Sequence, residues 1–138
     1  MKSYTISPHT ADVRLKIRGK TLEEIFLNAL EGMNRILIKN YEKYLNEHAI
    51  VKEMTISSFD TTTLLIDFLS EILTLSYINK AIFHTVSFLE IGPNTLHVRL
   101  IGGKVKSFKK DIKAISYHEA EIRRNQKGEY ETTLVLDI

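Results

Sequence analysis

Two stretches in which apolar residues recur at helical spacing constrain the fold of this chain more than any other feature. The first forms one broad apolar stripe from Leu22, Ile25, Phe26, Ala29, Leu30, Met33, Ile36 and Leu37. The second follows Asp60 and consists of Leu64, Leu65, Phe68, Leu69, Ile72 and Leu73. Stripes this wide must be covered by another apolar surface, so both helices are expected to pack against a sheet.

Strand-like patterns fill most of the remaining chain. Residues 12–18 alternate strictly between apolar and polar side chains, as in a half-buried strand, and the polar face is basic. Thr21-Leu22-Glu23-Glu24 has the form of a capping box at the start of the first helix. Residues 39–47 are expected to form a loop or a frayed helical turn, and Gly102-Gly103 to begin a longer connection. Further strands are predicted at residues 49–57, 82–91, 95–101 and 112–117, followed by a hairpin of residues 119–124 and 129–137.

The order of these elements predicts one α+β domain over residues 1–138. A mostly antiparallel β-sheet with two amphipathic helices packed on one face buries both helical stripes and one side of each strand. A chain of 138 residues is long enough to bury a single core of this kind. No internal repeat and no linker rich in Pro, Gly or Ser divides it.

Several kinds of catalytic and cofactor site are excluded by missing residues. The chain contains no cysteine, which rules out disulfides, thiolate catalysis and zinc-thiolate clusters. The glycine-rich motifs that bind dinucleotides or nucleotide phosphates are absent, as are H-E-x-x-H and G-x-S-x-G. The five histidines are scattered, and no two stand at a helical i, i+4 ligand spacing.

Charge and hydropathy point to a cytoplasmic protein without a membrane segment. The N-terminal residues do not resemble a signal peptide, and about 18 uninterrupted apolar residues occur nowhere. The formal net charge is only +2, which argues weakly against binding RNA mainly through phosphates. Basic residues concentrate in one segment, which is either a solvated loop, the favoured interpretation, or a surface for RNA or an acidic protein: Lys104, Lys106, Lys109, Lys110 and Lys113.

Two aspartates at opposite ends of the sequence are candidate ligands for a metal ion. Asp12 stands where the opening loop becomes a strand, where it either caps backbone N–H groups or points into a shared site. Asp137 ends an apolar strand beside the last residue, Ile138, so negative charge gathers there and a counter-ion would relieve the repulsion. Calcium or magnesium, with manganese as a further candidate, suits such oxygen donors better than zinc.

Five segments in register across the whole chain resemble the archease family: His9-Thr10-Ala11-Asp12, the capped helix start at 21–24, residues 67–73, residues 113–118 and Val135-Leu136-Asp137-Ile138. Two positions depart from the family pattern. Pro8 replaces a residue that is often glutamate, and Gly102 is followed by Gly103 where glutamate is common.

The resemblance implies an accessory protein rather than a free-standing enzyme. Archeases activate the RtcB-type RNA ligase of tRNA splicing and RNA repair, promoting guanylylation of the ligase and multiple turnover. The family's metal site maps onto Asp12, Asp137 and Ile138, the last through a backbone or terminal oxygen. His9 and His118 are candidates for hydrogen bonds that orient these carboxylates, or are structural. The ligase is then the expected partner, with only indirect or weak contact to RNA.

Two other functions remain open at this stage. One is a chaperone or specificity-modulating binding module for a tRNA-modifying enzyme such as a tRNA cytosine methyltransferase, which would use the lysine segment and the basic strand face. The other is a metal-dependent hydrolase acting alone, which is disfavoured because two carboxylates without a nucleophile or a leaving-group acid form an incomplete site.

Overall fold

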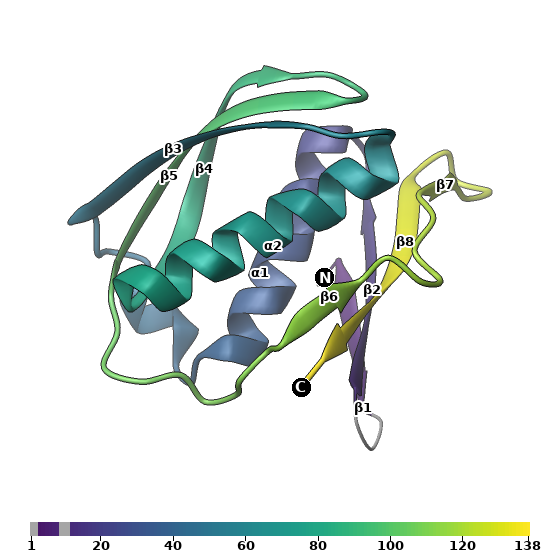
Figure 1. Cartoon of the computed structure of the whole chain (residues 1–138). Coiled ribbons are helices and arrows are strands. Elements are labelled where there is room, and N and C mark those ends of the chain that lie inside the picture. Colours follow the sequence, from purple (N-terminus) through teal and green to yellow (C-terminus); the bar gives the residue numbers. More distant parts are fainter. Residues whose placement is uncertain (1–2, 9–11) are drawn as a thin grey trace.

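The computed structural model of the protein describes residues 3–8 and 12–138 and contains two long helices and two β-sheets (Figure 1). The helices are α1 (Leu22–Leu37) and α2 (Thr61–Asn79), and Tyr41–Tyr44 forms the short 3-10 helix η1. The strands are β1 (Tyr4–Pro8), β2 (Asp12–Gly19), β3 (Ile50–Ser57), β4 (Ala81–Ile91), β5 (Thr95–Lys104), β6 (Ala114–Ser116), β7 (Arg123–Arg124) and β8 (Tyr130–Asp137).

The predicted α+β class is confirmed, and the strands divide between two antiparallel sheets. The larger sheet has the order β1-β2-β8-β6, with β7 also paired to β8, and the smaller has the order β3-β5-β4. Figure 1 shows both helices lying between the two sheets, and both of them contact strands of each sheet. This arrangement covers the helical stripes on two sides, so each sheet keeps one face free of helices.

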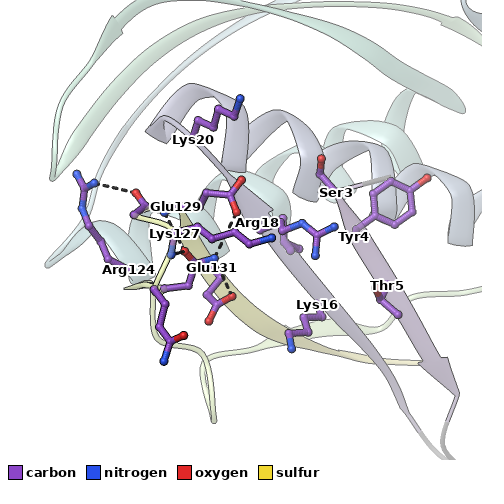
Figure 2. Close-up of a pocket in the computed structure, with 14 residues that line it drawn as sticks. Ser3, Tyr4, Thr5, Lys16, Arg18, Lys20, Arg124, Lys127, Glu129 and Glu131 are labelled. Atoms are coloured by element: carbon purple, nitrogen blue, oxygen red, sulfur yellow. Dashed lines mark hydrogen bonds between the residues drawn. The ribbon is translucent and has the colours of Figure 1, made fainter. Parts of the chain in front are cut away.

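The larger sheet therefore has a buried face and an open face. Along β2 the residues alternate, with Val13, Leu15 and Ile17 buried against the helices. The intervening positions lie on the other side of the sheet, as the two-residue period of a strand requires. The part of this open face next to the turn between β7 and β8 is drawn in Figure 2.

Both helices begin directly after the capping residues identified in the sequence, Thr21 and Asp60. The Thr21 hydroxyl accepts a hydrogen bond of 3.1 Å from the Glu24 N–H at the start of α1. The Asp60 carboxylate accepts one of 2.8 Å from the Thr63 N–H at the start of α2. Each bond satisfies a helix-end donor that has no partner within its helix. Lys80 ends α2 in the left-handed conformation.

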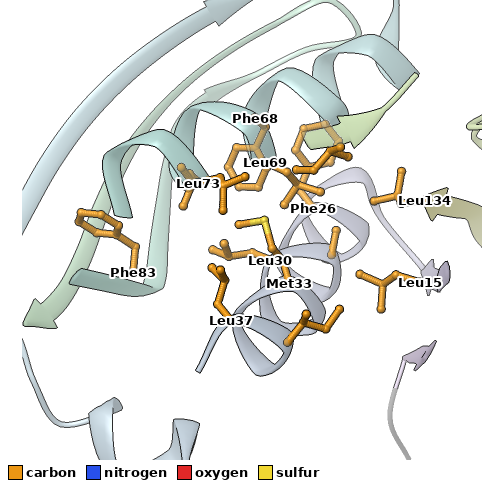
Figure 3. Close-up of a cluster of buried hydrophobic side chains, with 14 of the residues drawn as sticks. Leu15, Phe26, Leu30, Met33, Leu37, Phe68, Leu69, Leu73, Phe83 and Leu134 are labelled. Atoms are coloured by element: carbon orange, nitrogen blue, oxygen red, sulfur yellow. The ribbon is translucent and has the colours of Figure 1, made fainter. Parts of the chain in front are cut away.

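The core lies where the two helices meet each other and the sheets (Figure 3). Phe26 of α1 and Phe68 of α2 pack with their ring centroids 5.2 Å apart. Asn34, which is completely buried, donates a 2.8 Å hydrogen bond to the Phe83 carbonyl and so ties α1 to β4. All members of the first predicted stripe except Leu22 are buried.

Several details of the predicted secondary structure differ from the fold. The strands predicted at residues 112–117 and 119–124 are shorter in the structure, as β6 and β7. The edge strand β1 was not predicted, because it is short and ends at Pro8. The predicted connection at Gly102-Gly103 is wrong, since β5 continues through both glycines to Lys104. At Gly102 a Cβ atom would lie 1.9 Å from the Ile82 carbonyl oxygen, so only glycine permits this approach of β5 to β4.

One described helix, α2, is long and apolar enough by length and composition to span a bilayer. It lies between the two sheets, and its buried residues include Leu65, Phe68 and Leu69. We therefore assign α2 to the protein core, where apolar helices of this length are also found.

Candidate metal centre

The register of β2 and β8 places Asp12 directly opposite Asp137. Their Cα atoms are partners at one end of an antiparallel ladder that continues to the pair Gly19 and Tyr130. Directly opposed residues project from the same face of a sheet, with Cβ atoms about 4.5–5.5 Å apart. Two carboxylates from opposite ends of the sequence are thus neighbours on the open face, as the shared site suggested from the sequence requires.

No cationic side chain in residues 3–8 or 12–138 forms an ion pair with either carboxylate of the Asp12 and Asp137 pair. Arg14 follows Asp12 on the same strand face but forms a 2.8 Å ion pair with Glu119 instead. Asp12 Oδ1 is buried and has no hydrogen-bond partner in the described part of the chain. A buried acceptor of this kind is unfavourable unless a cation or another donor satisfies it.

The last residues of the chain are held in place beside this pair. The Lys113 N–H donates a 2.7 Å hydrogen bond to the Asp137 carbonyl, and Ala114 of β6 is the Cα partner of Asp137 on the other side of β8. The side chain of Ile138 is half-buried and packs against the hydrophobic core. The main chain of Asp137 is therefore fixed at the same end of the sheet as Asp12, and Ile138 is anchored beside it through its side chain.

The oxygen donors at this position fit a hard divalent cation, but the two carboxylate side chains alone do not complete its coordination. Calcium and magnesium prefer carboxylate and carbonyl oxygens, which are what Asp12, Asp137 and Ile138 offer. Within residues 3–8 and 12–138 no group of three or more His, Asp or Glu side chains is close enough together to hold a metal ion. A cation here would need oxygens from the main chain or from a partner molecule in addition to the two side chains.

The two candidate histidines are placed differently. His9 lies outside the described residues. His118 is exposed, and its N–H donates a 3.0 Å hydrogen bond to Ser116 Oγ. β6 runs antiparallel to β8, so the chain moves away from Asp137 between Ala114 and His118. No contact between the His118 side chain and either carboxylate is found among the described residues.

A second polar cluster, which the sequence did not single out as a site, joins α2 to the segment after β6. The Tyr117 hydroxyl and the Ser58 hydroxyl both donate hydrogen bonds to the Asp67 carboxylate, the second at 2.7 Å. The bond to Asp67 raises the pKa of Tyr117, since it stabilises the protonated phenol. Asp67 belongs to the segment 67–73 that carries the family resemblance, and its visible role here is to hold Tyr117.

Comparison with known proteins identifies the family of this chain. The model of the Archease protein family (MTH1598/TM1083) matches residues 4–138, which is nearly the whole chain. The chain belongs to the archease family. An archease of Methanosarcina barkeri is 32% identical to it, covering 99% of this chain and 97% of its relative. An archease of Saccharolobus islandicus is 28% identical over the full length of both chains.

Solved structures share the archease fold. The solution structure of Methanobacterium thermoautotrophicum protein 1598 matches all of both chains with a TM-score of 0.78 and 27% identity. The crystal structure of a Thermotoga maritima archease, described as a possible chaperone, matches 96% of both chains with a TM-score of 0.67. At 21% identity the second likeness concerns the fold alone.

Proposed function

We propose that this archease-family protein activates an RtcB-type RNA ligase in the cytoplasm, acting in tRNA splicing or RNA repair through a divalent cation held by Asp12, Asp137 and an oxygen of Ile138. It would act as an accessory protein and leave catalysis to the ligase, promoting its guanylylation and multiple turnover. The observation that carries the proposal is the position of Asp12 opposite Asp137 in the sheet.

The environment of the pair supports a binding role for these carboxylates. Two adjacent negative charges, one with a buried oxygen that has no partner among the described residues, form a negative position that no described cationic side chain offsets. Such a position is destabilising by itself and becomes favourable when a divalent cation shares both carboxylates. We infer calcium or magnesium, with manganese as a third candidate, from the oxygen donors alone.

The site is also accessible to a partner protein. Asp137 is exposed, and the pair stands at the end of an open sheet face rather than inside a cavity. A divalent cation held by few protein ligands supplies positive charge and open coordination positions to phosphate oxygens. The chain itself would contribute the fixed spacing of Asp12 and Asp137, which the sheet register and the Lys113 hydrogen bond maintain.

Guanylylation of a purified RtcB-type ligase tests the proposal directly. The ligase, GTP and metal would be combined with wild type, Asp12→Asn or Asp137→Asn, each first shown to be folded by circular dichroism. We expect both variants to lose most of the activation. Glu90→Gln is the matched control, because Glu90 is an exposed carboxylate on the other sheet. Full activation by both folded Asp variants would disprove the metal-site proposal.

A second candidate function rests on the lysine segment. Lys106, Lys109 and Lys110 are all exposed, although the backbone of the segment is tied to the ends of both helices by bonds such as that from the Lys109 N–H to the Leu37 carbonyl. A fixed basic surface suits a binding module or chaperone for a tRNA-modifying enzyme such as a tRNA cytosine methyltransferase. Replacing these three lysines with glutamine should then abolish binding of that enzyme and spare metal binding, whereas retained binding of the enzyme would exclude this role.

A further inference from the structure

The open face of the larger sheet carries a row of cations along β2 and just beyond its end. Arg14, Lys16 and Arg18 alternate along β2 on this face, and Lys20 follows the strand directly. Arg14 is paired with Glu119. The other three form no ion pair among the described residues. We call Lys16, Arg18 and Lys20 the basic track.

The basic track lines a hollow of about 980 Å³ at the end of the sheet away from Asp12 (Figure 2). The turn between β7 and β8 contributes two more cations, Arg124 and Lys127, and β1 contributes the Thr5 side chain. Figure 2 shows Lys16 and Lys20 at opposite ends of the hollow with Arg18 between them. Positive charge thus surrounds an open space that a ligand can enter from solvent.

Two acidic side chains share the hollow with these cations. Glu129 and Glu131 both line it, and each accepts a long hydrogen bond of 3.4 Å from the Asn125 amide. On the neighbouring part of the sheet, Glu121 is paired with Arg123 at 2.7 Å and Glu119 with Arg14. Five cationic side chains line the hollow against two carboxylates, so its potential is positive.

We infer that this face binds single-stranded RNA through its phosphates, along the basic track. Alternate residues of a strand are roughly 6.5–7 Å apart, which is close to the separation of successive phosphates in an extended single strand. Lys16 and Arg18 therefore lie in step with neighbouring phosphates, and the hydroxyl of Thr5, whose residue is the Cα partner of Lys16, is a further donor for phosphate oxygens.

The composition of the face favours RNA over an acidic protein. Protein interfaces bury an apolar centre, but the open-face positions of β2 beyond Asp12 are all cationic up to Gly19. The β8 positions opposite them are Val135, Thr133 and Glu131, of which one is apolar. Near the hollow, the Tyr130 ring is covered by the Arg124 guanidinium, so among the described residues base stacking contributes little and no sequence preference is expected.

The direction of the basic track also suits the proposed function. The choice of RNA over DNA as the ligand rests on that proposed function. Asp12 begins β2, Arg18 lies near its end and Lys20 follows it. RNA lying along the basic track would therefore extend toward the Asp12 and Asp137 pair. The distance from Arg18 to Asp12 is about 20 Å along the strand, which corresponds to a few nucleotides. The chain would then hold RNA and the candidate metal centre on one face.

Fluorescence anisotropy with a labelled, unstructured RNA of about ten nucleotides tests this inference. Wild type is compared with Lys16→Glu/Arg18→Glu/Lys20→Glu and with the control Lys106→Glu/Lys109→Glu/Lys110→Glu, which has the same change in charge. Lys16→Gln/Arg18→Gln is a milder variant in case charge reversal disturbs folding, which is checked by thermal unfolding. The buffer contains a chelator and no ligase, so the result does not depend on the proposed metal or partner.

For wild type we expect a Kd on the order of 10–100 μM, with log K falling by about 2 per tenfold rise in salt for three phosphate contacts. The track triple variant should bind at least about tenfold more weakly and lose most of that salt dependence. The lysine-segment control should stay within about twofold of wild type, and Asp12→Asn should bind no more weakly than wild type.

Three results would overturn the inference. The first is no binding by wild type. The second is equal weakening in both triple variants, which would indicate bulk charge rather than a site. The third is unchanged RNA binding by the track triple variant together with loss of ligase binding, which would make the surface a protein-docking site. Failure of Asp12→Asn to impair ligase activation would instead count against the proposed function and leave the RNA result intact.

Discussion

Asp12 and Asp137 are Cα partners across the β2–β8 ladder, although one stands near the start of the sequence and the other is its penultimate residue. Asp12 has one buried carboxylate oxygen without a hydrogen-bond partner, and no described cationic side chain pairs with either residue. Like charges placed directly opposite each other destabilise a sheet. A fold that keeps such a pair stores unfavourable electrostatic energy at one position, and that energy becomes measurable when one charge is removed.

We predict that Asp137→Asn stabilises the protein when metal is chelated. Removing one of two opposed charges should raise the free energy of unfolding by about 0.2–1 kcal/mol, because the amide keeps the shape of the carboxylate without its charge. Urea unfolding of wild type and variant in excess chelator measures the difference. Glu90→Gln, which removes an exposed carboxylate that forms no ion pair among the described residues, should change stability less. A destabilised Asp137→Asn protein would show that the Asp137 charge is already compensated.

We predict the opposite ranking when divalent metal is present. A ligand at about 100 times its Kd stabilises the native state by about 2.7 kcal/mol. For a chain of this size, each kcal/mol of stabilisation raises the Tm by roughly 3–5 °C. Calcium, magnesium and manganese would each be titrated into wild type, Asp12→Asn and Asp137→Asn during thermal unfolding. Only wild type should shift, and an equal shift in all three proteins would place the cation elsewhere.

Much of the secondary structure was predictable from local patterns, because the buried side chains of a helix or strand recur at its characteristic spacing. The strict alternation at residues 12–18 corresponds to β2, and the two apolar stripes correspond to α1 and α2, with Thr21 and Asp60 at their starts. These periods are visible in the sequence because each buried position requires an apolar residue. The division into two sheets was not predictable in this way, since periodicity fixes which face of a strand is buried and does not identify its neighbour.

The candidate site was predictable only in part for the same reason. Family resemblance and charge pointed to Asp12 and Asp137, whereas their direct opposition depends on the register of a ladder between the two ends of the chain. The hollow beside the basic track depends on the turn that brings Lys127 to the same hollow as Arg18, and no sequence pattern encodes that arrangement. Pairing between strands that are distant in the sequence cannot be predicted from local residue patterns.

Burial of Tyr4 predicts a loss of stability at alkaline pH. Burial, followed by the nearby Glu31 carboxylate, raises the pKa of Tyr4 to about 12 from its ordinary value of 10. Above pH 10 the unfolded chain releases the phenolic proton while the folded chain retains it, so unfolding becomes easier as the pH rises toward 12. Below pH 10 the contribution is fully present.

Comparison with Tyr4→Phe isolates this effect. The variant lacks the titrating group, so its free energy of unfolding should fall less than that of wild type between pH 10 and 12. Urea unfolding midpoints measured across that range provide the test. Parallel pH curves for the two proteins would show that the Tyr4 phenol has the same pKa in the folded and unfolded chains.

The surroundings of Gly103 bear on the glutamate that the family resemblance leads us to expect at this position. A Cβ atom on Gly103 would lie 2.3 Å from the Cβ of Glu47, so a side chain cannot enter unless Glu47 moves. Glu47 is held by its backbone, since its N–H donates to the Tyr44 carbonyl and its carbonyl contacts His84 Nε2 at 2.6 Å. In this chain the segment before β3 therefore fills the space beside β5 that a side chain at 103 would need.

Gly103→Glu should consequently destabilise this protein by about 1–3 kcal/mol, the usual cost of overpacking, even though the family resemblance leads us to expect glutamate there. The cause can be separated from a general effect of charge with a double-mutant cycle. Glu47→Gly removes the obstructing Cβ atom, so the double variant Glu47→Gly/Gly103→Glu should lose less stability than the sum of the two single variants, as measured by urea unfolding. Strictly additive losses would mean that Glu47 is not the obstacle and that β5 rejects a side chain at 103 for another reason.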